Sequence, residues 1–299
     1  MSKYCPIYQH IVLSQDCVEC DTKECLLTKY KEKKMENKDD EARITRASNA
    51  QYNINYINHY MNYDTKYSIS KSCIYKPDPS SDKNIVPFCV TANDSVTEVK
   101  QQCCKDNEAK ICVLDFASYT HAGGAYLEGG KAQEEDLCTH STLYPVLSSH
   151  NADFYAPHIE DKNSGLYTDE CLYIPGIAFY NKPADDSVRP VMYGVSDVIV
   201  CAAPNANTAS RNGISKSDIE KAMFNRISTI FHVVFVKNKC STLIAGAFGC
   251  GVFGNDPAVT AALFKQIHDN MYPNTNVVFA IPGNDGNREI FETIFFGKK

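Results

Sequence analysis

Short apolar segments alternate with amphipathic segments from residue 86 onwards, and this alternation restricts the fold more than any other feature of the chain. The apolar segments predict strands at Val86–Thr91, Ile111–Phe116, Leu172–Tyr180, Val195–Ala203, Ser241–Ala247 and Asn276–Ile281. The amphipathic segments predict helices at Ser95–Cys104, Gln133–Leu147, Ile219–Val234, Asn255–Tyr272 and Asn287–Phe296. Strands that alternate with helices indicate a layered α/β domain with a largely parallel sheet.

Local signals refine this pattern at several points. "SVTE" (Ser95–Glu98) has the spacing of a capping box and predicts the start of a helix. Asp256 followed by Pro257 is typical of an N-cap and first turn. Apolar residues at helical spacing predict a further helix over about Asp40–Tyr63, and Pro, Ser and Asp predict a loop at Lys76–Asn84.

Two glycine-rich segments follow predicted strands. They are "HAGGAYLEGG" (residues 121–130) and "GAFGCGVFGNDP" (residues 246–257), and the second ends where the Asp256-capped helix begins. In parallel sheets, ligands bind beyond the carboxyl ends of the strands. Glycines let main-chain N–H groups approach phosphate oxygens, and a helix N-terminus favours an anion. Neither segment is a P-loop or a G-x-G-x-x-G fingerprint, which argues against a nucleotide kinase or a dehydrogenase.

Composition excludes several classes of protein. The net charge of -6 and the pI near 5.8 give no basic surface for sequence-independent nucleic-acid binding. No apolar run is long enough for a membrane span or a signal-peptide core. Fourteen cysteines without an export signal predict reduced thiols, and hence an intracellular, cytoplasmic protein.

Four of the cysteines lie close together at the N-terminus, with the spacing C-x11-C-x2-C-x4-C. A C-x2-C pair is a common half of a tetrahedral zinc site, and this segment has too few apolar residues for a core of its own. The alternative is four unconnected thiols. We therefore expect two parts, residues 1–35 as a Cys-rich segment with a possible zinc module and residues 36–299 as the main domain. The candidate zinc ligands are Cys5, Cys17, Cys20 and Cys25.

The two loops and their surroundings resemble a known family. "VLDFASYTHAGGAYLEGGKAQEEDLC" (residues 113–138) is similar to the signature of microbial-type poly(ADP-ribose) glycohydrolases, and "GAFGCGVFGND" and "VIVCAAPN" are similar to further segments of that family. The resemblance covers roughly Glu36 to Phe296. It implies a three-layer, macrodomain-like α/β fold with a mixed, largely parallel sheet between helices. It also implies hydrolysis of the O-glycosidic ribose bonds of poly(ADP-ribose) to release ADP-ribose, with no cofactor required for catalysis.

The resemblance also implies roles for individual residues. Glu135 matches the general acid and Glu134 the residue that holds ribose hydroxyls. Such an acid needs a raised pKa, which burial must maintain against the helix dipole. Consecutive helical residues point about 100° apart, so the two glutamates cannot share one task. The expected substrate-binding residues are Asp94 (adenine, or only a helix cap), Ser118, Gly123, Gly124, Ala125, Gln133, Gly249, Cys250, Gly251, Val252, Phe253 (stacking on the distal ribose) and Gly254.

The chain departs from the family signature at three places. Ala125 replaces the third glycine of the triplet, which adds a methyl group where the backbone meets the ligand. Ala122 replaces a proline, and Thr139-His140 replaces a pair of arginines. Two other functions stay open, a hydrolase of mono-ADP-ribose on protein or nucleic acid and a non-hydrolytic ADP-ribose reader. The expected partners are ADP-ribose or poly(ADP-ribose) on modified macromolecules, with no membrane, no strong sign of direct nucleic-acid binding, and a monomeric chain.

Overall fold

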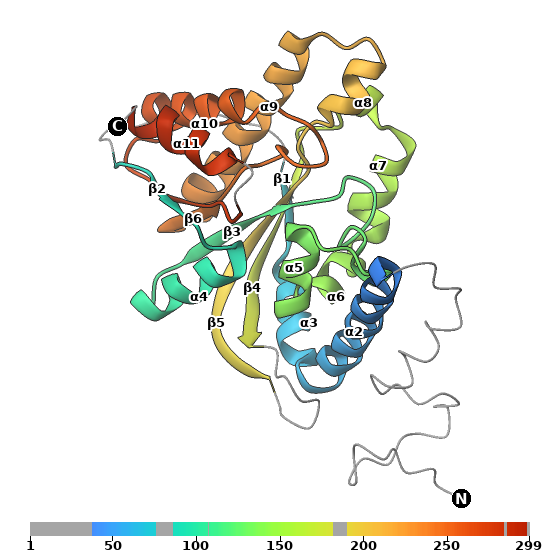
Figure 1. The fold of residues 1–299 in the computed structure, drawn as a ribbon. Coiled ribbons are helices and arrows are strands. Elements are labelled where there is room, and N and C mark those ends of the chain that lie inside the picture. Colours follow the sequence, from blue (N-terminus) through green and yellow to red (C-terminus); the bar gives the residue numbers. More distant parts are fainter. Residues whose placement is uncertain (1–37, 76–85, 107, 182–189, 284–285, 298–299) are drawn as a thin grey trace, which may run out of the picture.

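The computed structural model describes residues 38–75, 86–106, 108–181, 190–283 and 286–297. The four N-terminal cysteines and the predicted loop at Lys76–Asn84 lie outside the described residues. Within them the chain forms one sheet with helices on both of its faces (Figure 1).

The sheet has seven strands in the order β1-β4-β5-β3-β6-β7-β2. The four pairings from β5 to β2 are parallel, and the pairings β1·β4 and β4·β5 are antiparallel. The predicted α/β fold with a mixed, largely parallel sheet is therefore confirmed. The strands are β1 (Cys73–Tyr75), β2 (Cys89–Thr91), β3 (Ile111–Phe116), β4 (Cys171–Asn181), β5 (Val191–Cys201), β6 (Thr242–Ala245) and β7 (Asn276–Ala280).

The helices form two layers around this sheet (Figure 1). One hydrophobic core joins the sheet to α9, α10 and α11, and a second joins its other face to α2, α4, α5 and α6. The α-helices are α2 (Lys38–Tyr60), α3 (Asn62–Lys71), α4 (Ser95–Lys105), α5 (Gln133–His140), α6 (Leu143–Ser149), α7 (Ala156–Glu160), α8 (Ala206–Arg211), α9 (Lys216–Phe231), α10 (Pro257–Met271) and α11 (Asn287–Phe296). The short helical turns are η1 (Tyr126–Glu128), η2 (Asn151–Tyr155), η3 (Asn163–Gly165) and η4 (His232–Lys237).

Strand β3 is the centre of the molecule and leads to the first glycine loop. Apart from Asp115, it is apolar on both faces because each face packs under helices. Leu114 lies in the core under α9 and α10, whereas Val113 lies in the core under α5 and α6. Strands β3 and β6 are parallel neighbours, so the loops that follow them, residues 117–132 and 246–256, leave the sheet at the same edge.

The helix predicted over Gln133–Leu147 is two helices. Helix α5 ends at His140 and α6 begins at Leu143, because the two residues between them pair with strand β4. Ser141 is extended and bridges Phe179, and the N–H of Thr142 donates to the carbonyl of Ala178 at 3.0 Å. This tertiary pairing, which helical periodicity cannot reveal, interrupts the helix.

Other predicted boundaries also shift. The strand expected at Val86–Thr91 is only β2 (Cys89–Thr91), an edge strand whose Cys89 is exposed rather than buried. The helix expected to end at Tyr63 ends at Tyr60 and continues as α3 after a break at Met61. The segment Ile219–Val234, predicted as one helix, is helical throughout, but its last residues belong to the π-helical turn η4.

Two further observations concern the cysteines and the helices. The ten cysteines of the described residues carry free thiols. Among these residues, no helix combines the length and the apolar character that crossing a membrane requires.

Candidate active site

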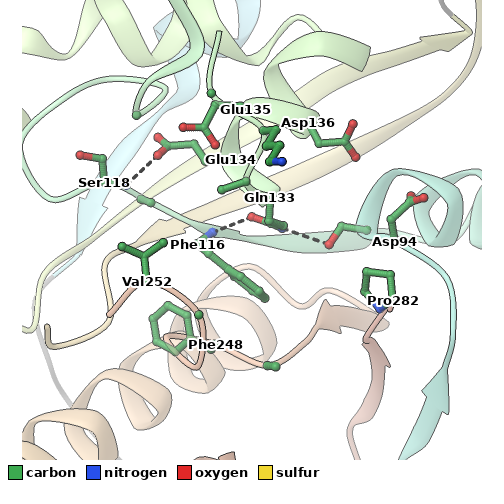
Figure 2. Close-up of a pocket in the computed structure, with 18 of the residues that line it drawn as sticks. Asp94, Phe116, Ser118, Gln133, Glu134, Glu135, Asp136, Phe248, Val252 and Pro282 are labelled. Atoms are coloured by element: carbon green, nitrogen blue, oxygen red, sulfur yellow. Dashed lines mark hydrogen bonds between the residues drawn. The ribbon is translucent and has the colours of Figure 1, made fainter. Parts of the chain in front are cut away.

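A cavity of about 780 Å³ opens where the two glycine loops meet, at the carboxyl edge of the sheet. Figure 2 shows Glu134 and Glu135 on one side of this cavity and Phe248 and Val252 on the other. Ten of the predicted site residues line it: Asp94, Ser118, Gly124, Gln133, Glu134, Glu135, Gly249, Gly251, Val252 and Phe253.

Glu134 and Glu135 are the buried carboxyl groups that line this cavity. They lie in the first turn of α5 and expose only 3% and 7% of their surface. The N–H of Ser118 donates to Oε2 of Glu134 at 2.7 Å, and the N–H of Ala125 donates to Oε1 of Glu135 at 2.8 Å. Main-chain groups from two different positions of the loop therefore fix the two side chains. The second oxygen of each, Oε1 of Glu134 and Oε2 of Glu135, has no hydrogen-bond partner among the described residues.

Electrostatics favour a protonated group in this pair. Burial raises the pKa of Glu134 well above its usual range, and the charges of Asp115 and Glu135 raise it further. Main-chain hydrogen bonds from Ser118 and Gly123 act in the opposite direction and lower this pKa. Sequence analysis expected a raised pKa for Glu135, the residue that matches the general acid, and this stays a prediction; the group whose pKa burial raises is its neighbour Glu134.

The glycine loop leaves no room for side chains beside the glutamates. Gly124 has a φ of +58°, and a Cβ atom there would lie 2.6 Å from Oε1 of Glu135 and 2.9 Å from Oε2 of Glu134. Any other residue at this position would displace both carboxylates, because contacts below 3.0 Å force one atom to move.

Gln133 lines the cavity, but the protein itself uses its amide. Its Oε1 accepts the N–H of Phe116 at 2.9 Å, and its Nε2 donates to the carbonyl of Leu114 at 2.8 Å and to Ser95 Oγ at 3.0 Å. These bonds tie the start of α5 to the end of β3, as Figure 2 shows in part. These bonds hold the start of the helix that carries the two glutamates, and contact between Gln133 and substrate stays a prediction.

Asp94 caps helix α4 and also borders the cavity. Its Oδ1 accepts the N–H of Thr97 at 2.6 Å, and its Oδ2 accepts the Thr97 hydroxyl at 3.0 Å. The capping box predicted on Ser95 is therefore wrong, because the cap lies one residue earlier and the Ser95 hydroxyl accepts from Gln133. The cap that sequence analysis weighed for Asp94 is confirmed, and contact with adenine stays a prediction.

The second loop places its glycines in two different environments. Gly249 has a φ of +74°, and a Cβ atom there would lie 2.5 Å from the Cβ of Ala203. At Gly251 an added Cβ atom would meet nothing within 4 Å. Asn255 closes the loop by donating to the carbonyls of Pro204 and Gly249, at 2.8 Å and 3.0 Å. The predicted N-cap Asp256 is confirmed at the start of α10.

Two side chains of the second loop border the cavity mouth. Val252 is 85% exposed. Phe253 is partly buried and lies edge-on to Tyr167, with 6.1 Å between ring centroids. A solvent-facing apolar group beside an anchored aromatic ring suits a stacking contact with a sugar.

Four predicted binding residues shape the loops without lining the cavity. Gly123 packs against the ring of Tyr144, and Gly254 packs against Asn207. The thiol of Cys250 donates to the carbonyl of Phe248 at 3.6 Å. The methyl group of the fourth, Ala125, lies beside Gly130, and contact between this methyl group and a ligand stays a prediction.

Sequence reasoning missed several residues of the cavity wall. Phe116 and Phe248 form an aromatic pair, with ring centroids 5.7 Å apart. Pro282 follows strand β7 and lies near them, and Arg46 reaches the cavity from α2. Phe116 and Pro282 could have been found as residues at or just after carboxyl strand ends. Arg46 could not, because only the fold brings α2 to this edge.

The described residues hold no group of three or more His, Cys, Asp or Glu side chains arranged for a metal ion. The described site offers two carboxyls, main-chain donors and aromatic walls.

The sequence profile of the microbial-type PARG catalytic domain matches residues 31–182, about half of the chain. The chain therefore belongs to this family, the microbial-type poly(ADP-ribose) glycohydrolases, and the family predicted from the sequence is confirmed. A search of curated proteins finds no match.

Solved structures of bacterial poly(ADP-ribose) glycohydrolases have the same fold. The enzyme from Thermomonospora curvata is 24% identical, with a TM-score of 0.74 over 85% of this chain and 100% of that chain. The same enzyme bound to the inhibitor ADP-HPD gives a TM-score of 0.72 at the same identity and coverage. The Deinococcus radiodurans enzyme in complex with ADP-ribose is 25% identical, with a TM-score of 0.66 over 77% of this chain and 96% of that chain.

Proposed function

We propose that this protein hydrolyses the O-glycosidic ribose bonds of poly(ADP-ribose) and releases ADP-ribose, with Glu135 as the general acid. The observation that carries this proposal is the pair of buried glutamates that line the cavity, each held by one main-chain N–H. The cavity of about 780 Å³ is within the size range of small-molecule and cofactor sites.

The loops suggest an orientation for the substrate. The diphosphate would lie against Gly251 and its neighbours, near the N-terminus of α10, where main-chain N–H groups and the helix dipole favour an anion. Adenine would lie at the end of the cavity bordered by Asp94, Phe116 and Pro282. The distal ribose would stack on Phe253. The bound inhibitor and ADP-ribose of the two bacterial enzymes support this class of ligand.

The glutamates would then divide the chemistry. The carboxyl group of Glu134 accepts hydroxyl groups of the ribose, and the carboxyl group of Glu135 protonates the oxygen of the leaving group. The bond between the anomeric carbon and that oxygen breaks, water adds to the carbon, and a proton from the water returns to Glu135. The balance is one water consumed per bond, so the proposed reaction uses no cofactor.

Matched glutamine variants test this assignment. Glu135→Gln keeps the shape of the side chain but removes the transferable proton, so hydrolysis should fall on the order of a hundredfold or more. ADP-ribose affinity should barely change, because the diphosphate and adenine contacts remain. Glu134→Gln is the matched control, and it should weaken both affinity and turnover because it alters a direct ribose contact.

Three substrates separate the possible activities: poly(ADP-ribose), mono-ADP-ribosylated protein and ADP-ribosylated DNA. Release of ADP-ribose from the polymer at the highest rate is the expected result. Hydrolysis by Glu135→Gln at the wild-type rate would assign the acid to another residue. A wild-type protein that binds ADP-ribose and hydrolyses none of the three substrates would be a reader instead.

A further inference from the structure

Two basic side chains line the cavity beside the first glycine loop. Arg46 reaches it from α2, and Lys131 comes directly after the loop. Among the described residues they are the only lysine and arginine side chains of the cavity wall, and neither forms an ion pair with another described residue. The acidic Asp136 of the same wall lies instead 3.1 Å from Nδ1 of His140. Cations that the protein leaves unpaired at a cavity wall indicate a place for an anion.

The first glycine loop holds these two cations close to the proposed acid. Nε of Arg46 donates to the carbonyl of Gly129 at 2.6 Å, and a Cβ atom at Gly129 would lie only 1.9 Å from a main-chain oxygen of α2. The next residue, Gly130, packs against the acid, because a Cβ atom there would lie 2.8 Å from Oε1 of Glu135. Lys131 follows immediately in the chain. Both basic side chains therefore belong to the part of the wall that surrounds Glu135.

Asn49 adds an unused acceptor to the same part of the wall. It follows Arg46 by three residues in α2, so the two side chains lie on one face of the helix. Asn49 lines the cavity, and its Oδ1 is buried without a hydrogen-bond partner among the described residues. Buried acceptors in folded proteins almost always have partners, so this atom suits a donor supplied by a ligand.

The order of the substrate along the cavity gives this region an occupant. The proposed function places the diphosphate and distal ribose of the released unit against the second loop, across the cavity from the glutamates. Because Glu135 protonates the leaving oxygen, the leaving group must lie on the side of Glu135. In poly(ADP-ribose) this oxygen belongs to a ribose of the next unit, which carries an adenine and a further diphosphate. Nearby carboxylates would repel that diphosphate unless cations offset them.

We propose that Arg46, Asn49 and Lys131 form a subsite for the leaving ADP-ribose unit, in which the two basic side chains bind its diphosphate and Oδ1 of Asn49 accepts a ribose hydroxyl. The inference rests on the proposed function, because it takes Glu135 as the acid. Hydrogen bonds between cationic donors and phosphate are among the strong ones. The subsite therefore favours the polymer over a substrate whose leaving group carries no phosphate, such as a mono-ADP-ribosylated peptide.

Affinities measured in the Glu135→Gln protein test the subsite without turnover. The two probes are ADP-ribose and a two-unit oligomer of poly(ADP-ribose). The oligomer should bind on the order of tenfold more tightly, because only its second unit reaches the subsite. Adding Lys131→Gln should reduce this advantage to about threefold or less and leave the Kd of ADP-ribose unchanged. Lys221→Gln, which alters an exposed lysine of α9 outside the cavity, is the matched control and should change neither affinity.

Two further changes in the same Glu135→Gln protein separate the contributions. Asn49→Leu removes the acceptor and should weaken binding of the oligomer alone. Arg46→Gln should do the same, and its melting temperature shows whether loss of the bond to Gly129 disturbs the loop. If that variant melts several degrees lower, Lys131→Gln decides the role of the cations. The advantage of the oligomer should also shrink as the salt concentration rises, because salt screens contacts between exposed charges.

Turnover by the otherwise unaltered enzyme gives the specificity. Lys131→Gln should lower kcat/KM for the polymer by about three- to tenfold and leave kcat/KM for a mono-ADP-ribosylated peptide unchanged. Equal affinity of the two probes in Glu135→Gln, or an oligomer advantage that Lys131→Gln retains in full, would refute the subsite. A loss confined to ADP-ribosylated DNA would assign these residues to a nucleic-acid acceptor and overturn the proposal. Because the affinities need no turnover, a wild-type protein that hydrolyses nothing would contradict the proposed function and leave the binding test intact.

Discussion

The main-chain N–H of Ala125 donates to Oε1 of Glu135 at 2.8 Å, so the residue that departs from the family's glycine triplet is also the one that holds the proposed acid. Ala125 contributes only its backbone to this contact. Ala125 has a φ of -96° and a ψ of 26°, a conformation open to residues other than glycine. The loop can therefore carry a side chain at this position without moving Glu135.

Replacing Ala125 by glycine should leave hydrolysis unchanged. The methyl group faces Gly130 and not the cavity, so its removal should alter turnover by less than about twofold. The unfolding free energy should fall by about 0.5–1 kcal/mol, because glycine gains more freedom in the unfolded chain. Hydrolysis rates and denaturant unfolding of both proteins measure these two effects.

Ala122→Gly is the matched control for this change, since it adds the same freedom to the same loop at a residue that packs against the core. It should lower stability by a similar amount. A several-fold gain in turnover in the Ala125 variant alone would show that the methyl group does reach the substrate.

Gly249 and Gly251 of the second loop should respond differently to substitution. Gly251→Val should keep the melting temperature of the free protein, because its side chain enters open space. It should lose the stabilisation by ADP-ribose, which is about 2.7 kcal/mol for the wild type at a ligand concentration a hundred times Kd. Gly251→Ala should show an intermediate loss. Thermal melting with and without ADP-ribose measures both quantities.

Gly249→Ala provides the contrast for this prediction. Its Cβ atom would lie 2.5 Å from that of Ala203 in a left-handed backbone conformation, so the free protein should lose about 1–3 kcal/mol of stability. A loss of ligand stabilisation at Gly249 alone would not identify the phosphate site. If Gly251→Val keeps the full wild-type shift, the second loop does not bind the diphosphate.

Much of this fold follows from local patterns. The predicted bounds of β3 and α11 match the structure because each element carries its own signal, a run of buried apolar residues or an amphipathic stripe. The meeting of the two glycine loops also follows, since adjacent parallel strands end at one edge. The loops and the glutamate pair therefore identified the place of the site.

The remaining features depend on contacts between distant parts of the chain. The break between α5 and α6 requires Thr142 to pair with Ala178, and nothing within the helix indicates that pairing. The amide of Gln133 reaches Leu114 and Ser95, which only the packing of α5 on β3 brings together. Asp115 lies in a strand buried on both faces, so alternation alone could not say which of the two cores its side chain enters.

The N-terminal cysteines remain to be tested by metal analysis. We propose that residues 1–35 form a separate segment with a structural zinc ion, and that residues 36–299 form the catalytic unit. The motivation is the spacing of Cys5, Cys17, Cys20 and Cys25, which could close a tetrahedral thiolate site. The full chain should then contain about one zinc ion, which deletion of residues 1–34 or a Cys17→Ser/Cys20→Ser double change should remove.

Hydrolysis and ADP-ribose binding should survive this deletion. The cavity-lining residues of the described chain begin at Arg46, and the deletion leaves α2 intact. That helix must stay, because Arg43 donates from Nε to the carbonyl of Glu128 at 2.8 Å and so supports the first glycine loop. The deletion should therefore remove the metal without affecting turnover. A folded full-length protein without zinc would mean that the four cysteines are separate thiols, and loss of turnover together with zinc would mean that the segment belongs to the catalytic unit.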